Sequence, residues 1–129
     1  MDTFPQFVFV YGTLRRGGSD HFRTAGADFV SSGTICGRMY QIDWYPGLVL
    51  DPKGDEIRGE VYSVGSELLS ALDAFEGLSV GKTGGSEYRR VQTTVMKQDS
   101  QTLSAWVWEW CGPVDESQRL VTGDWLKQK

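Results

Sequence analysis

Glycine divides this chain into short segments. Sixteen glycines are spread along its 129 residues, and glycine is among the residues that most often mark a turn. A chain interrupted this often favours short strands joined by tight turns, so the sequence predicts a strand-rich fold.

Several segments have the composition of β-strands. Residues 7–11 form a continuous apolar run of aromatic and β-branched side chains, which is typical of a buried strand. Residues 57–64 alternate between two faces, as a strand does. Further strands are expected over 29–42, 48–50, 88–97 and 102–110, with a turn at 46–47 and a hairpin turn over 51–55.

One segment has the pattern of a helix. Apolar side chains recur at helical spacing on one face of residues 66–75. Ser66 is a suitable N-cap, and Gly77 is suitable as the residue that ends the helix. One helix among many strands predicts an α+β fold with a curled sheet or small mixed β-barrel. The length, with no linker or repeat, favours a single domain over residues 1–129.

Charge and composition exclude several classes of function. The 13 basic and 17 acidic residues give a net charge of −4, which does not support nucleic-acid binding. No apolar run approaches the roughly 20 residues that cross a bilayer, and the N-terminus lacks the features of a secretory signal. Cys36 and Cys111 make no disulfide framework and are expected to be small core residues, which favours a cytoplasmic setting. The sequence leaves the oligomeric state open.

A carboxylate is the first candidate for chemistry. With one histidine, His21, and two scattered cysteines, a zinc site of the usual kind is not expected. Glu76 follows the predicted helix directly. Apolar neighbours would remove water from it and Asp73, three residues earlier, would add a like charge; both effects raise the pKa of a carboxyl group toward useful general-base strength. The alternative is a solvated carboxylate pair at a helix end.

A glycine-rich loop is the second candidate. Residues 12–18 follow the first strand, and successive backbone N–H groups in such a loop can bind an anion, with Arg15 and Arg16 adding positive charge. The alternative is an ordinary turn with solvated arginines.

Two strands carry further candidates. Strand alternation places Tyr88 and Arg90 on one face, where an arginine could bind a carboxylate or else be solvated. The row formed by Trp106, Trp108 and Trp110 is expected to pack in the core rather than to form a ligand platform.

Six short motifs, taken in order, resemble one known family. The segments are 11–17 (YGTLRRG), 46–48 (PGL), 58–62 (RGEVY), 72–77 (LDAFEG), 88–90 (YRR) and 123–125 (GDW). They resemble the γ-glutamylcyclotransferase-like family over about residues 7–126, and the small size resembles its compact bacterial members and the γ-glutamylamine cyclotransferases. The glycine-rich segment 79–86 departs from many relatives in lacking a proline.

The resemblance implies a fold, an activity and a site. It implies a small mixed barrel with flanking helices and a cavity at one end. The family cleaves γ-glutamyl compounds by intramolecular attack, releasing 5-oxoproline and an amine or amino acid, with no cofactor or metal. Glu76 matches the catalytic glutamate, which would act as general acid and base. The substrate-binding residues would be Tyr11, Gly12, Thr13, Leu14 and Tyr88.

Two other functions remain open from the sequence. The same fold could bind a carboxylate or γ-glutamyl ligand without turning it over. An interaction protein would instead have a shallow pocket and would expose the tryptophan row as a partner surface. The sequence does not identify the leaving group.

Overall fold

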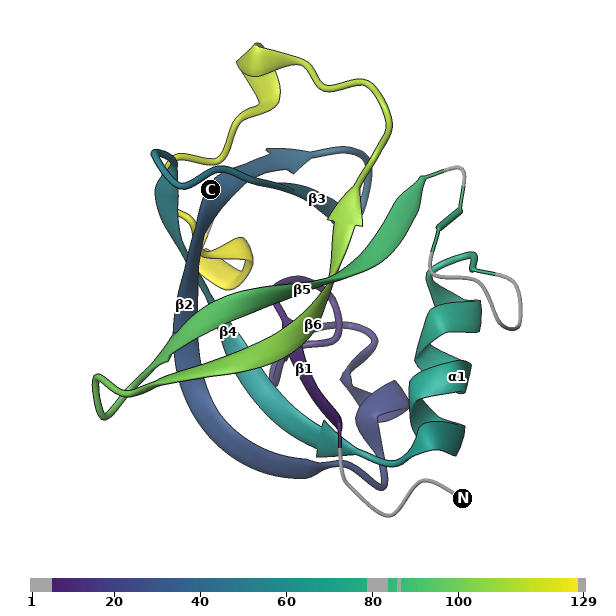
Figure 1. Cartoon of the computed structure of the whole chain (residues 1–129). Coiled ribbons are helices and arrows are strands. Elements are labelled where there is room, and N and C mark those ends of the chain that lie inside the picture. Colours follow the sequence, from purple (N-terminus) through teal and green to yellow (C-terminus); the bar gives the residue numbers. More distant parts are fainter. Residues whose placement is uncertain (1–5, 79–83, 86, 128–129) are drawn as a thin grey trace.

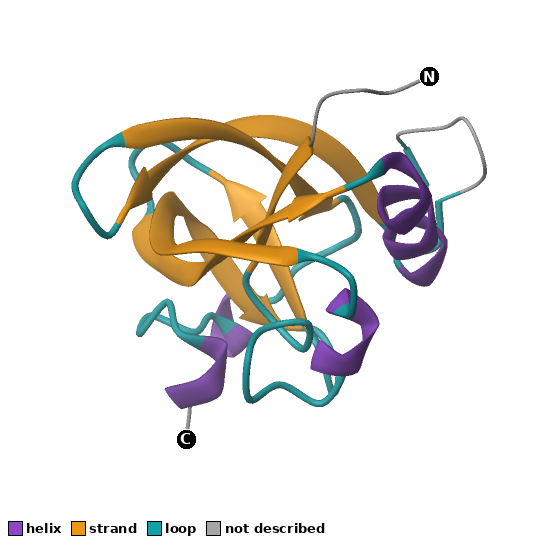
Figure 2. Ribbon diagram, turned by 90° about the horizontal axis from the view of Figure 1, so that it is seen from below, coloured by secondary structure: helices purple, strands orange, loops and turns teal. Residues whose placement is uncertain are grey.

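Five strands close into a barrel in the computed structural model, which describes residues 6–78, 84–85 and 87–127. The closed order is β2–β4–β1–β6–β5, with β5 pairing back to β2. β1 and β6 run parallel, and the other neighbours run antiparallel (Figures 1 and 2). The barrel strands are β1 (Gln6–Val10), β2 (Asp28–Gln41), β4 (Asp55–Val64), β5 (Tyr88–Lys97) and β6 (Thr102–Trp110). The prediction of a small mixed barrel is confirmed.

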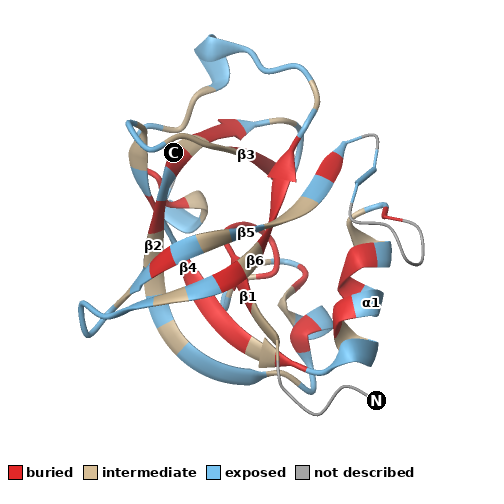
Figure 3. Cartoon of the chain, in the orientation of Figure 1, coloured by how far each residue is buried: buried red, intermediate tan, exposed pale blue. Residues whose placement is uncertain are grey.

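β1 is buried on both faces. Phe9 belongs to the apolar cluster that fills the barrel, whereas Val8 and Val10 belong to a second cluster between the barrel and the helix. A strand covered on both sides needs apolar residues at every position, which explains the continuous run in the sequence. Figure 3 shows buried residues on the barrel strands and on the side of the helix that faces them.

The helix α1 (Ser66–Phe75) lies against the outside of the barrel (Figure 1). Its N-cap is Gly65 rather than Ser66, so that detail of the prediction is wrong by one residue. The predicted end is confirmed: Gly77 has a φ of +86°, and the N–H groups of Gly77 and Leu78 donate to the carbonyls of Ala74 and Asp73. This Schellman motif makes Glu76 the last residue of the helix end and fixes the direction in which the chain leaves it.

Two turn predictions are corrected by β3 (Pro46–Leu50). Pro46 and Gly47 pair with Gln41 and Tyr40 of β2, so they begin a strand instead of forming a turn. A proline is tolerated there because the first residue of a strand need not donate a hydrogen bond. Residues 51–54 then join β3 to β4. The two strands both pair with β2 and form no hairpin with each other, so the hairpin predicted at 51–55 is wrong.

Among the other predictions from the sequence, some are confirmed and some are wrong. Cys36 and Cys111 are exposed, so their assignment to the core is wrong. Trp108 and Trp110 are buried, as expected of core residues, and Trp106 is half-buried. Most of segment 79–86 lies outside the described residues. No helix among the described residues is long and apolar enough to span a membrane.

Arg15 joins three distant parts of the chain. Its Nε donates to Glu60 Oε2 and one terminal nitrogen donates to Asp124 Oδ1, both at 2.7 Å, and all three side chains are largely buried. Arg16 instead stacks on the ring of Phe29, at 4.1 Å. The expectation that the two arginines add charge to the glycine-rich loop's binding site is therefore wrong, because Arg15 is neutralised by the fold.

Replacing Arg15 tests this anchoring. Arg15→Met leaves the carboxylates of Glu60 and Asp124 buried without their cation, so the free energy of unfolding is expected to fall by about 3–5 kcal/mol at neutral pH. Urea denaturation measures the change. The control is Arg58→Met, which removes an exposed arginine of β4 paired only with the exposed Glu56. Equal and small losses in the two variants would contradict the anchoring role.

Candidate active site

A cavity of about 240 Å³ opens at one end of the barrel, beside the C-terminal end of α1. All six site residues predicted from the sequence line it. They are Tyr11, Gly12, Thr13, Leu14, Glu76 and Tyr88. The structure therefore brings the predicted residues together, although they span most of the chain.

Strand directions explain why these segments meet. β1 and β6 are parallel, so both carboxyl ends lie at the same end of the barrel, and Tyr11 Oη donates to the carbonyl of Trp108 at 2.8 Å. β5 is antiparallel to β6, so its first residue, Tyr88, pairs with Trp110 at that end. The chain enters β5 soon after leaving α1, which brings Glu76 to the same place.

The carboxylate of Glu76 has no protein partner among the described residues. No residue in the described part of the chain donates a hydrogen bond to it or pairs with it in a salt bridge. Asp73, on the previous turn, has the opposite environment: Arg90 Nε and Trp108 Nε1 both donate to its Oδ1, at 2.9 and 2.8 Å. Arg90 thus binds a carboxylate of the protein itself.

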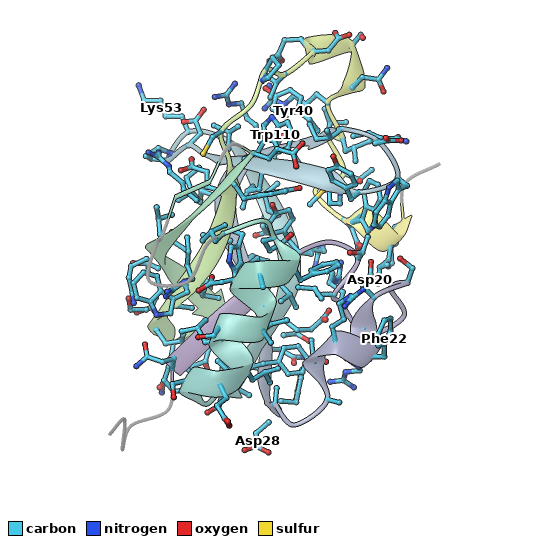
Figure 4. All side chains as sticks on the ribbon, turned by 90° about the vertical axis from the view of Figure 1, so that its right-hand side faces the viewer. Asp20, Phe22, Asp28, Tyr40, Lys53 and Trp110 are labelled. Carbon is cyan, nitrogen blue, oxygen red and sulfur yellow. The ribbon has the colours of Figure 1, made fainter. Side chains whose placement is uncertain are left out.

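The surroundings of Glu76 disfavour its charge. Burial, together with the nearby negative charges of Asp20, Asp73 and Glu87, raises its pKa from 4.5 to about 8. Asp20 is buried on the segment beside α1 (Figure 4). The prediction that apolar neighbours and Asp73 raise this pKa agrees with the structure, and Asp20 is a contributor that the sequence pattern does not reveal.

The loop after β1 presents free backbone donors to the cavity. Gly12, Thr13 and Leu14 are buried, yet their N–H groups donate to no atom of the described residues. Their carbonyls are occupied, for example by the N–H of Asp20 on Thr13, at 2.8 Å. Buried N–H groups normally have partners, so three free ones on a cavity wall are suited to a bound carboxylate.

The two predicted tyrosines line the cavity, and both of their hydroxyl groups donate to backbone carbonyls of the protein. Tyr11 Oη donates to Trp108, and Tyr88 Oη donates to the carbonyl of Pro46 at 2.7 Å. Burial, with the charge of Glu76 added, raises the pKa of both. They therefore stay neutral and offer a ligand ring faces and oxygen lone pairs, not protons.

Gly12 is required by a close approach. A Cβ at this position would lie 2.6 Å from Pro46 Cγ, well inside van der Waals contact. Because Pro46 also holds the hydroxyl of Tyr88, any side chain at position 12 would disturb two walls of the cavity.

Sequence reasoning missed part of the lining. Trp44, Tyr45, Phe75 and Glu87 also face the cavity. Phe75 lies within the motif 72–77 and the other three lie next to a motif, but their residue types gave no separate signal. His21 lies outside the cavity with its Nδ1 on the carbonyl of Leu14. The described residues contain no cluster of three or more His, Cys, Asp or Glu side chains that could hold a metal ion.

Comparisons with known proteins point to one family. The family model described as gamma-glutamyl cyclotransferase, AIG2-like, matches residues 8–127. The Escherichia coli gamma-glutamylcyclotransferase family protein YtfP is 34% identical over 123 residues, covering 92% of this chain and 95% of that protein. The Rattus norvegicus gamma-glutamylaminecyclotransferase is 35% identical over 82 residues, which cover 54% of each chain.

Solved structures show the same fold. The solution structure of Escherichia coli YtfP has a TM-score of 0.65 and 31% identity, covering 95% of this chain and 97% of that one. The crystal structure of an AIG2-like protein from Mus musculus has a TM-score of 0.72 and covers 98% of this chain and 85% of that one. At 24% identity it supports the fold alone.

The environment of Glu76 predicts a pH-dependent stability. Folding raises its pKa from 4.5 to about 8, so between these pH values the folded state binds this proton more tightly than the unfolded chain. The free energy of unfolding therefore falls as pH rises through this window, by at most about 1.4 kcal/mol per pH unit from this group. Glu76→Gln removes that loss, so its stability relative to wild type is expected to increase across the window.

Chemical denaturation at several pH values measures this difference. Glu67→Gln, at an exposed position in the first turn of the same helix, is the matched control and is expected to show no such trend. A constant difference between Glu76→Gln and wild type across the window would show that Glu76 titrates as an ordinary glutamate.

Proposed function

Because this chain belongs to the AIG2-like gamma-glutamyl cyclotransferase family, we propose that it cleaves a γ-glutamyl compound to 5-oxoproline and a free amine or amino acid, with Glu76 as general acid and base. The observation that carries the proposal is that the carboxylate of Glu76 and the backbone N–H groups of residues 12–14 line one cavity, and that neither has a partner among the described residues. The glutamyl end of such a compound is a zwitterion: its α-ammonium suits the carboxylate of Glu76, and its α-carboxylate suits the N–H groups.

The cavity suits the charges of the substrate. The N–H groups of Gly12, Thr13 and Leu14 would bind the α-carboxylate, and Glu76 would lie beside the α-ammonium. Binding the substrate curled in this way brings its amine to its own γ-carbonyl, and such positioning can supply about 7–11 kcal/mol of a reaction barrier.

The raised pKa of Glu76 brings it closer to that of the proton it must take. An α-ammonium group has a pKa of about 8 at a chain N-terminus, and the free α-carboxylate of a γ-glutamyl compound raises that pKa further. Because the pKa of Glu76 rises from 4.5 to about 8, the free-energy cost of moving this proton to Glu76 falls by about 4–5 kcal/mol.

The reaction then needs no other protein group to carry a proton. Glu76 takes a proton from the α-ammonium, and the free amine attacks the γ-carbonyl carbon to form the ring nitrogen–carbon bond. As the tetrahedral intermediate collapses, the bond to the leaving nitrogen breaks. Glu76 gives its proton to that nitrogen and then takes the second proton from the ring nitrogen, which is positively charged after the attack, and passes it to the amine. 5-Oxoproline therefore leaves as a neutral lactam, the amine leaves as an ammonium, and the carboxylate is regenerated.

Replacing Glu76 by glutamine tests whether its carboxylate is the base. Glu76→Gln keeps the shape of the side chain and removes its basicity, so kcat for 5-oxoproline release is expected to fall about 10²–10⁴-fold. A panel of γ-glutamyl amino acids and γ-glutamyl amines, assayed for 5-oxoproline, measures it, with Glu67→Gln as the control. Isothermal titration with the same compounds shows whether the variant still binds them.

Two outcomes would contradict the proposal. Turnover that survives in Glu76→Gln would exclude Glu76 as the base. Binding without turnover in the wild-type protein, equal in Glu76→Gln, would instead favour a binding module on the same fold.

The ionisation of Glu76 predicts how the rate depends on pH. The value of kcat/KM is expected to rise with pH toward an apparent pKa near 8, which is that of Glu76 in the free protein. The apparent pKa in kcat is expected to be lower, because the bound ammonium stabilises the carboxylate. Initial rates across the pH range separate the two. Identical apparent pKa values in both profiles would mean that the ammonium does not bind beside Glu76.

A further inference from the structure

The mouth of the cavity differs in character from its interior. Residues 11–14, on the inner wall, are buried. At the mouth, Trp44 is 60% exposed although it lines the cavity, and Glu87 is exposed as well. The ring of Tyr45 meets that of Trp44 edge to face, at 5.1 Å between centroids and an interplanar angle of 82°, which supports Trp44 from one side.

Both mouth residues are held by the fold. The backbone of Glu87 accepts a hydrogen bond from the N–H of Cys111, at 2.6 Å, directly before β5 begins. Trp44 stands two residues before β3, where the carbonyl of Tyr45 accepts from the N–H groups of Ile42 and Asp43. The backbone at both positions is therefore fixed at the mouth by hydrogen bonds.

The described lining of the cavity is acidic. It contains the carboxyl groups of Glu76 and Glu87 and no lysine, arginine or histidine, and because the pKa of Glu76 is raised to about 8, Glu87 supplies the negative charge at neutral pH. Two arginines of nearby segments are already paired, Arg15 with Glu60 and Asp124, and Arg90 with Asp73. The charge of Glu87 acts inside the cavity, since it adds to the effect of burial in raising the pKa of Tyr45.

The proposed orientation of the substrate places its leaving group at the mouth of the cavity. If the glutamyl end is held by residues 12–14 and Glu76, the group on the γ-nitrogen must point toward the exposed side of the cavity, past Trp44 and Glu87. A carboxylate carried by that group would meet Glu87 as a like charge, whereas an ammonium would meet both a carboxylate and the face of an indole ring.

We propose that the preferred substrate is a γ-glutamyl amide of a diamine, in which the leaving amine carries a second, positively charged nitrogen that Glu87 and Trp44 bind at the mouth. This inference rests on the proposed function, which it sharpens by naming the substrate class. Glu87 and Trp44 are then specificity-determining residues.

Three probes of equal chain length test the charge preference. They are the γ-glutamyl amides of diaminopentane, hexylamine and aminohexanoic acid, which end in an ammonium, a methyl group and a carboxylate. The value of kcat/KM is expected to be about tenfold higher for the ammonium probe than for the methyl probe, and lowest for the carboxylate probe. The preference should shrink as salt is added, because the mouth is open to solvent.

Substitutions at the mouth identify the residues responsible. Glu87→Gln is expected to lower the ammonium-to-methyl ratio of kcat/KM about three- to fivefold, and Glu87→Lys to favour the carboxylate probe over the ammonium probe. Trp44→Leu should lower the same ratio, because it removes the aromatic face. The control Glu67→Gln should leave the ratio at the wild-type value.

The outcomes separate this inference from the proposed function. If none of the probes or of the panel of γ-glutamyl compounds releases 5-oxoproline, the proposed function fails. If the three probes react at equal rates, or if their ratio is the same in wild type, Glu87→Gln and Glu87→Lys, the reaction stands and the inference about the leaving group is overturned.

Discussion

The parallel pairing of β1 with β6 is the constraint on which the rest of the structure depends. β1 lies between β4 and β6 and is buried on both faces, so it supplies apolar side chains to the barrel interior and to the layer under α1. Because the pairing is parallel, both strands end at the same place, and the loop after β1 meets the last residues of β6. The cavity forms where these carboxyl ends meet.

Two carboxylates at the C-terminal end of α1 show how position decides chemistry. Asp73 and Glu76 are three residues apart, but Asp73 accepts hydrogen bonds from Arg90 and Trp108, and Glu76 accepts none from the described residues. Asp73 is therefore a structural anion, which fastens the helix to β5 and β6. Its negative charge lies next to Glu76, so the carboxylate that fastens the helix also contributes to the raised pKa on which the proposed chemistry depends.

The sequence predicted those features that have local causes. The double-sided burial of β1 required the run at 7–11, and the left-handed conformation of Gly77 required a glycine after the helix. The turn predicted at Pro46 and Gly47 was wrong because turn-forming residues can also begin a strand. The expectation that Arg15 adds charge to the glycine-rich loop was wrong because its partners Glu60 and Asp124 are far away in the sequence. Only the closed barrel brings them to it.

The candidate site also combines residues that the sequence predicted with residues that only the fold reveals. Its six predicted residues line one cavity, but their roles in catalysis and binding stay predictions. Trp44 and Glu87 carry no motif of their own, and Asp20 reaches the environment of Glu76 only through the fold. Residues of this kind are recognised by what surrounds them in space, which a single sequence does not contain.

The hydrogen bond between Tyr11 and Trp108 spans 97 positions of the chain, and this has a consequence for folding. Contacts this distant in sequence must be made against a large loss of chain entropy, so a barrel closed by them is expected to fold slowly. The cavity walls come from both sides of that closure, so a partly folded chain has no binding site. A ligand that binds the finished cavity therefore draws the whole barrel toward its native state and acts as a chemical chaperone for the protein that recognises it.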